Sequence, residues 1–501
     1  MKKHIVGFSR SLSLILTALM LLSLISCAES GDTPDDTSPQ ATEAGSEAAT
    51  DDPEYRCDLP DGLNFGTEVN YLYTIAANRD DELVSEDYGL GVVSDSVYER
   101  NAAVSEKLGV DLAFTGRNSD IDTASAISGL VSAGDKSVDI FVIGTYSVLT
   151  PILAGHYLNL NGVSNLDLSK LYWNQYYNEM MTFTSDNLQF AATSPTAISM
   201  FRDGYLTIFN RDKLAEYQIP DLYETVWNGD WTLEYQYGLI KDVYTDANGD
   251  GRRDIDDFFG FYVGNVTDMD VYAVSSDIHL AVRDENGDLL YNTDAFERLV
   301  DMGEKVSALC NAPGTYLVNS FNEGFDVPIE KFTQKKALMA TTMFGLVERN
   351  IEYLADISYG IAPIPKLTKE QAHYGTYIQD QVSCFGISAS IGDEDRQAVL
   401  GAVMEAMSYY SYVIVRPAYY DVALSLRFMQ DPQSKAILDT MFESISFDYV
   451  YATSLGGVRD SMRSVISSTK PAIASQEKKW QKLVENALKS QQRSLDKLKN
   501  K

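Results

Sequence analysis

The sequence predicts an α/β protein in which a parallel sheet is covered by helices on both faces. Strand-like and helix-like segments alternate from residue 69 to residue 143, in the order strand, helix, strand, helix, strand. The last of these strands, 138–143, is almost entirely apolar, which is typical of a strand buried on both faces of a sheet. With 501 residues, of which 45% are hydrophobic and 22% charged, the chain has a globular composition and the length for two or three domains.

The elements of this first region follow from hydrophobic spacing and end signals. Strands are predicted over 69–74, 110–114 and 138–143, and helices over 94–108 and 123–132. Gly109 follows the first helix, where a glycine commonly ends one. Sheets of this kind bind ligands at the carboxyl ends of their strands, here residues 75–79 and 144–147. No glycine-rich phosphate loop follows the first strand, so a dinucleotide is not indicated.

The rest of the chain alternates in the same way and finishes in a long helix. The predicted elements are strands 205–210, 337–343, 359–364 and 382–387, helices 212–217, 221–226 and 396–413, the last continuing past Pro417 to 429, and a hairpin 278–290. Asn286-Gly287 suits the tight turn of that hairpin. Residues 475–501 carry apolar residues at helical spacing and an excess of basic ones. We expect this helix to dock on its own acidic domain; contact with a partner or with lipid headgroups is the alternative.

The amino terminus has the form of an export signal. Positive charges at Lys2, Lys3 and Arg10 precede an apolar run over 12–25, which is too short for a comfortable bilayer span. We expect residues 1–26 to be removed.

The residues at the end of this signal indicate lipidation. Leu24-Ile25-Ser26-Cys27 resembles the lipobox of bacterial lipoproteins, in which the cysteine becomes the first residue and carries lipid. An ordinary secretory signal with a chance cysteine is the alternative. Residues 27–65, which begin with a stretch rich in Ser, Thr, Ala, Gly and acidic residues, are expected to form a disordered tether. The mature protein is then lipid-anchored outside the cytoplasmic membrane.

Charge and cysteine content exclude further classes. Lys and Arg total 40 against 72 Asp and Glu, a formal net charge of −32, so nucleic acid would be repelled and is not an expected partner. The cysteines other than Cys27 are Cys57, Cys310 and Cys384, which lack the spacing of a metal or redox motif. At most one disulfide can form, and we expect free thiols.

One acidic loop, 246–257, matches the ligand spacing of an EF-hand calcium loop. Gly251 stands at position 6, where the loop turns sharply. The expected ligands of a structural Ca²⁺ are Asp246, Asn248, Asp250, Arg252 through its carbonyl, Asp254 and Asp257. Position 12 is Asp257 rather than the usual Glu, so an acidic turn that binds no calcium is the alternative.

Several stretches, taken in order, resemble the extracellular solute-binding proteins of carbohydrate ABC transporters. They are Val97-Tyr98-Glu99-Arg100-Asn101, Leu108-Gly109-Val110, Asp139-Ile140, Ile208-Phe209-Asn210-Arg211-Asp212-Lys213-Leu214, Asp221-Leu222-Tyr223-Glu224, Gly229-Asp230-Trp231-Thr232, the acidic loop, Tyr359-Gly360-Ile361-Ala362-Pro363-Ile364-Pro365-Lys366 and Pro417-Ala418-Tyr419-Tyr420. The resemblance spans about residues 67–490.

The resemblance implies a type II periplasmic-binding-protein fold with two α/β lobes, a hinge that the chain crosses three times, and an extra C-terminal helix. The first lobe is then 66–195 with 358–412, and the second is 196–357 with 413–501. The crossings fall near 192–195, 358–361 and 411–416. Ligand lies between the lobes, and the protein acts as a monomer that delivers it to membrane permease subunits.

Candidate ligand contacts follow from the strand-end loops and from the resemblance. In the first lobe, Asn78 and Arg79 offer hydrogen bonds and Tyr146 offers a stacking ring. The candidates in the second lobe, in places where sugar-binding relatives carry polar or aromatic groups, are Asn265, Phe344, Tyr449 and Tyr451. Trp173 lies near the expected cleft, but packing is its expected role.

We therefore expect capture of a sugar or oligosaccharide without catalysis. The alternatives are a sensor or adhesion lipoprotein and a glycan-processing enzyme. The chain has only four histidines, none in a nucleophile or metal-ligand spacing, and its many carboxylates identify no catalytic pair. The identity of the solute stays open, because peptide and polyamine binders share the fold.

Overall fold

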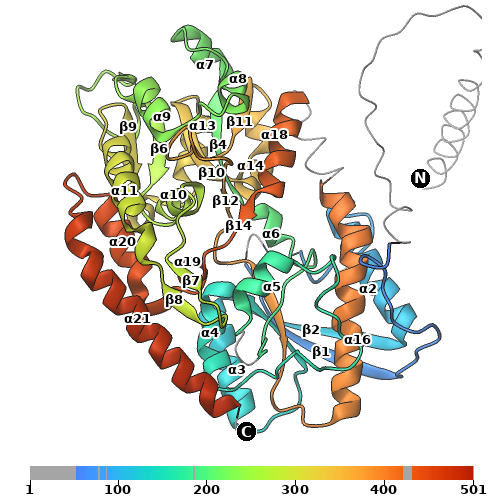
Figure 1. The fold of residues 1–501 in the computed structure, drawn as a ribbon. Coiled ribbons are helices and arrows are strands. Elements are labelled where there is room, and N and C mark those ends of the chain that lie inside the picture. The colour runs from blue at the N-terminus through green and yellow to red at the C-terminus, as the bar shows by residue number, and fades with distance from the viewer. Residues whose placement is uncertain are drawn as a thin grey trace, which may run out of the picture. The chain divides into compact units, whose positions relative to one another are not determined.

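The computed structural model describes residues 52–76, 79, 81–85, 87–183, 187–420 and 432–499. The export signal, Cys27 and most of the expected tether lie outside these residues, as does Asn78. Two main sheets organise the described chain, and helices surround both (Figure 1).

The first sheet has the strand order β13-β3-β1-β2. Its strands are β1 (Thr67–Thr74), β2 (Val110–Arg117), β3 (Ile140–Gly144) and β13 (Ser383–Ile387). β1 pairs in parallel with both β2 and β3, which confirms the predicted parallel sheet. The late strand β13 joins antiparallel to β3, with Ser383 opposite Gly144.

Helices connect and cover this sheet. They are α2 (Val92–Leu108), α3 (Asp120–Ser132), α4 (Thr145–Leu153), α5 (Gln175–Met181) and α16 (Glu394–Tyr410). Gly109 ends α2 with φ 61°, a conformation that favours glycine, as predicted. α2 and α16 lie side by side in Figure 1 and contact each other.

The second sheet has the order β11-β4-β10-β6-β5, with β9 beside β6. Its strands are β4 (Tyr205–Asn210), β5 (Tyr244–Thr245), β6 (Phe258–Gly264), β9 (Thr315–Val318), β10 (Ala337–Met343) and β11 (Tyr359–Ala362). β10 is parallel to β6 and antiparallel to β4, so the sheet is mixed.

Many short helices and two small ladders complete this second region. The remaining helices are α6 (Ser199–Arg202), α7 (Arg211–Glu216), α8 (Leu222–Trp227), α9 (Leu233–Ile240), α10 (Val271–Ser275), α11 (Phe296–Cys310), α12 (Ser320–Glu323), α13 (Val327–Thr333), α14 (Phe344–Arg349), α15 (Ile351–Leu354), α18 (Pro432–Glu443), α19 (Tyr449–Ala452), α20 (Val458–Ile466) and α21 (Ile473–Leu498). The ladders are the predicted hairpin, β7 (Ala281–Arg283) with β8 (Leu289–Tyr291), and the pair β12 (Thr376–Tyr377) with β14 (Ile445–Ser446).

The chain passes three times between the two sheets. The first passage is 193–204, the second 378–382, and the third leaves α16 at residue 411 and leads to α18. The expected crossing at 358–361 is wrong, because β11 pairs with β4, with Tyr359 opposite Asn210, and so belongs to the second sheet. The strand that returns to the first sheet is β13, about twenty residues later.

The expected tether also ends earlier than predicted. Tyr55 stacks on Tyr412, with ring centroids 5.3 Å apart, and Leu59 is buried. The carboxylate of Asp58 pairs with the ammonium of Lys170 at 2.5 Å. Residues 52–65 therefore pack against the folded part, because a few apolar and paired side chains outweigh the acidic composition around them.

Two long helices have an unusual composition, one apolar and the other basic. The helical run Glu394–Tyr420 is long and apolar enough to cross a membrane, but 67% of its most apolar window is buried, as in a core helix. α21 buries Trp480, Val484 and Leu495 and contacts α11 and α20. This confirms that the basic C-terminal helix docks on its own chain.

All three of Cys57, Cys310 and Cys384 are free thiols.

Candidate functional site

A cavity of about 370 Å³ lies where strand ends of both sheets meet. Its wall includes Ala76, just after β1 of the first sheet, and Thr341 to Met343 at the end of β10 of the second. Gln379 and Gln381 of the second crossing also line it. Three larger hollows, of about 670, 620 and 500 Å³, are not lined by the residues that follow β1 or by the end of β10.

Two buried carboxylates, Asp268 and Asp270, follow β6. The Gly264 N–H donates to Asp268 Oδ2 at 2.7 Å, and Asp268 lines the cavity. Burial raises the pKa of Asp268 to about 7. Nearby, burial raises the pKa of Asp270 to about 6, although Arg463 Nε donates to Asp270 Oδ1 at 2.8 Å.

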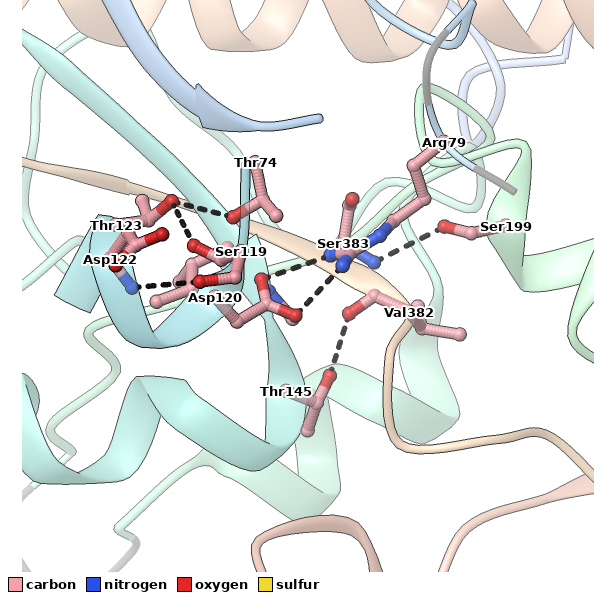
Figure 2. A network of polar contacts seen from close by, with 12 residues as sticks. Thr74, Arg79, Ser119, Asp120, Asp122, Thr123, Thr145, Ser199, Val382 and Ser383 are labelled. Carbon is pink, nitrogen blue, oxygen red and sulfur yellow. Dashed lines mark hydrogen bonds and ion pairs between the residues drawn. The ribbon is translucent and has the colours of Figure 1, made fainter. Parts of the chain in front are cut away.

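The first lobe presents a buried ion pair at its strand ends. Arg79 donates to Asp120 Oδ1 at 3.2 Å and to Asp120 Oδ2 at 2.7 Å (Figure 2). Asp120 begins α3 and also accepts from the Gly144 N–H at 2.7 Å. Burial disfavours the charged guanidinium, but the carboxylates of Asp120, Glu82 and Asp203 together outweigh burial and raise the pKa of Arg79. Arg79 is thus engaged within the protein rather than open to a ligand.

A second buried carboxylate, Glu82, joins two of the crossings. Glu82 Oε2 accepts from the Ser199 N–H at 3.1 Å and from Ser199 Oγ at 2.9 Å, and Ser383 Oγ donates to Glu82 Oε1. Ser199 lies in the first crossing and Ser383 follows the second, and the Ser383 N–H donates to Ser199 Oγ at 3.2 Å (Figure 2). Burial raises the pKa of Glu82.

The second crossing also contacts both lobes directly. The Tyr146 N–H, at the start of α4, donates to the Asp380 carbonyl at 2.9 Å. Arg459 of α20 forms an ion pair with the Asp380 carboxylate and donates to the Tyr451 carbonyl at 2.9 Å. The segment that lines the cavity through Gln379 and Gln381 is therefore held from both sides.

Of the seven predicted ligand residues the structure describes six, and none of these six lines the cavity. Arg79 is ion-paired, Tyr146 is half-buried, and Asn265 Oδ1 accepts from the Ser320 N–H at 3.1 Å. The three aromatic candidates are buried and contact other side chains of the protein. The Phe344 ring stacks on the Phe442 ring, the Tyr449 hydroxyl donates to Gln491 Oε1, and the Tyr451 hydroxyl donates to Met462 Sδ. Direct ligand contact by these residues stays a prediction that their burial does not favour. Trp173 is buried and donates to Glu405, as expected for a packing residue.

Other residues take the lining positions that sequence reasoning missed. Thr341 and Thr342 lie near the end of the predicted strand 337–343, and this strand end was the sequence feature that could have identified them as lining residues. Gln379 and Gln381 precede another predicted strand. Phe325 and Arg349 lie in segments without any local signal for a binding role.

The acidic loop has internal hydrogen bonds that fix its turns. Gly249 and Gly251 N–H groups donate to the two carboxylate oxygens of Asp246, and the Ala247 N–H donates to Asp257 Oδ1. Gly251 has φ 74°, consistent with the sharp turn expected there. Within the described residues, however, no group of three or more His, Cys, Asp or Glu side chains converges on a metal position. The loop therefore has the turns of a calcium site, but its carboxylates would have to move to surround an ion.

Comparison with known proteins supports the architecture. No family model matches the chain, and no curated protein is similar to it in sequence. A sugar transporter from Rhizobium etli in an open conformation is similar in structure, with a TM-score of 0.53, 13% identity, and coverage of 84% of this chain and 99% of that one. The apo-form of RafE from Streptococcus pneumoniae is similar with a TM-score of 0.51 and 15% identity, and the match covers 86% of this chain and 100% of RafE. An ABC substrate-binding protein from Listeria monocytogenes in complex with cycloalternan is similar with a TM-score of 0.50 and 12% identity, and the match covers 86% of this chain and 99% of that one.

These likenesses, together with the two sheets and three crossings, show the fold. The chain has the two-lobed α/β architecture of ABC-transporter solute-binding proteins, the type II periplasmic-binding-protein fold.

Proposed function

We propose that this protein is the solute-binding component of an ABC importer and that it captures a sugar or oligosaccharide between its lobes. The observation that carries the proposal is the position of the 370 Å³ cavity, whose wall combines both sheets' strand ends with the second crossing. Movement about the crossings would change this wall and so couple ligand binding to closure of the lobes.

The polar lining of the cavity can hydrogen-bond a hydroxyl-rich ligand, and Asp268, Asp326 and Arg349 add charged hydrogen-bonding groups to it. Gln379, Gln381, Thr341 and Thr342 carry amide and hydroxyl groups that both donate and accept hydrogen bonds, as sugar hydroxyls require. Tyr205 also lines the cavity, but its side chain is 1% exposed and packs on Tyr377, so it shapes the wall rather than offering a face for stacking.

A panel of mono- and oligosaccharides, screened by thermal unfolding, tests this function. A bound sugar raises the melting temperature by mass action, and chromatography of the mixture shows whether the sugar stays intact. Release of cleaved product would favour a glycan-processing enzyme. The panel also includes short peptides and polyamines. If only those compounds raise the melting temperature of the protein, the carbohydrate assignment is rejected while solute binding is retained.

The proposal extends to the protein's location. The lipobox-like residues before Cys27 favour export and lipid attachment outside the cytoplasmic membrane, where permease subunits of the importer would be the partners. Labelling with a radioactive fatty acid tests this. The Cys27→Ala variant should carry no label and should no longer be found in the membrane fraction. Equal labelling of both forms would contradict lipidation at Cys27.

We also propose that the loop 246–257 binds a structural Ca²⁺. The spacing of its oxygen side chains and the turns fixed around Asp246 support this assignment. Asp246, Asn248, Asp250, Asp254 and Asp257, with the Arg252 carbonyl, would hold the ion and stabilise the loop.

A further inference from the structure

Two phenylalanine rings stand exposed on a short segment that follows β9. Phe321, on α12, is 78% exposed, and Phe325, just after that helix, is 44% exposed. Their ring centroids are 5.6 Å apart and their planes are perpendicular, at 89°. The rings therefore pack on each other edge to face and leave most of the Phe321 surface to solvent.

Hydrogen bonds hold this segment in place. Asn265 Oδ1, at the end of β6, accepts from the Ser320 N–H at 3.1 Å. The Glu323 carboxylate accepts from the Asn319 N–H at 2.6 Å and from Tyr316 Oη–H at 2.6 Å. Because the segment is anchored, Phe321 and Phe325 form an exposed apolar surface of fixed position.

The ring pair continues the wall of the proposed sugar cavity. Phe325 lines the 370 Å³ cavity, and Phe321 contacts Phe325 on the solvent side of the same segment. A cavity of this volume is near the lower end of the range for small-molecule sites, so a longer glycan has to extend beyond it. The CH face of a pyranose ring is apolar and stacks on an aromatic ring.

We propose that Phe321 and Phe325 form an outer stacking subsite for a second or later sugar ring of an oligosaccharide whose first ring lies in the cavity. This inference rests on the proposed function and refines it: the solute is an oligosaccharide rather than a monosaccharide. Asn265, a predicted ligand residue, then acts as a positioning residue, since it holds the segment that carries the rings.

Calorimetric titration with oligosaccharide ladders tests the subsite. Gluco-, xylo- and manno-oligosaccharides of one to five residues are titrated into the wild type, Phe321→Ala and Tyr353→Ala. Tyr353 is the matched control, because its ring is 70% exposed and does not line the cavity. Both substitutions replace exposed side chains and should leave the fold intact.

In the ladder that binds, affinity should increase with length in the wild type. Phe321→Ala should weaken the longer members about three- to tenfold, the effect of one aromatic contact, and leave the shortest binding member unchanged. Tyr353→Ala should change neither. Equal affinities of the wild type and Phe321→Ala for every length would overturn the outer subsite while leaving the proposed function standing. Absence of binding to any sugar by the wild type would reject the proposed function and the subsite with it.

Discussion

Arg79 and Asp120 form a buried ion pair in which Arg79 Nη2 lies 2.7 Å from Asp120 Oδ2 and both side chains are 2% exposed. The pair joins the loop after β1 to the first turn of α3, where a negative charge also favours the helix dipole. An arginine that the sequence offers as a ligand contact is thereby a structural residue of the first lobe.

Removing one member of this pair should destabilise the protein strongly. Arg79→Met leaves the Asp120 carboxylate buried without its partner, and we expect a loss of roughly 3–5 kcal/mol of unfolding free energy. Urea unfolding measures it. The double variant Arg79→Met/Asp120→Asn, which removes the stranded charge but keeps an acceptor for the Gly144 N–H, should recover part of the loss. A single variant within about 1 kcal/mol of the wild type would refute this assignment.

Glu405 should make stability depend on pH. Burial raises its pKa to about 7, although Tyr172, Trp173 and the Asp167 N–H donate hydrogen bonds to the carboxylate. In the unfolded chain the pKa of a glutamate is about 4.3. The stabilising contribution of the neutral acid is therefore complete below about pH 4 and is lost as the pH rises to about 7.

Glu405→Gln tests this dependence directly. Between pH 5 and pH 8 the variant should lose about 2 kcal/mol less stability than the wild type, because the buried amide does not ionise. Glu394→Gln, at an exposed carboxylate on the same helix, serves as the control and should follow the wild type. Parallel pH profiles for Glu405→Gln and the wild type would disprove the assignment.

Arg283 should restrain opening of the lobes. From β7 of the second lobe, its Nη2 donates to the carbonyls of Glu179, Met180 and Thr182 at 2.7–3.0 Å, at the C-terminal end of α5 in the first lobe. Arg283→Met should lower the unfolding free energy by about 1–3 kcal/mol and increase the radius of gyration of the ligand-free protein. Lys435→Met, which removes an exposed ion pair within α18, is the control for small-angle scattering. An unchanged radius and unchanged stability would show that this contact does not hold the lobes.

Calcium should stabilise the wild type through the acidic loop. At free calcium about 100-fold above the dissociation constant, mass action contributes about 3 kcal/mol. Melting in EDTA and in excess Ca²⁺ should differ for the wild type and coincide for Asp246→Ala. Identical wild-type curves under both conditions would rule out an occupied site.

Local patterns in the sequence predict much of the fold but few of its long-range partners. The strands 69–74, 205–210, 337–343 and 382–387 are all found, because alternation and apolar runs are local signals. β11 is also found as a strand, but its partner β4 lies about 150 residues away in the sequence. The local sequence of β11 therefore does not predict that it joins the second sheet.

The same distinction explains the candidate site. Arg79 was visible as a strand-end residue, but its partner Asp120 is 41 residues away and decides its role. The cavity brings together Ala76, Thr342 and Gln381 from three distant segments. Phe321 carries no sequence pattern, since its exposure depends on how Asn265 anchors the segment that bears it.

Hydrogen exchange measured by mass spectrometry, with and without a saturating oligosaccharide, tests most directly whether solute is held between the lobes. The account predicts slower exchange in peptides from both lobes at once, containing Ala76, Val266 to Asp268 and Thr341 to Met343, and in the crossing that contains Gln379 and Gln381. Protection confined to one lobe, or to the larger hollow lined by Gln371 to Gly375, would contradict it.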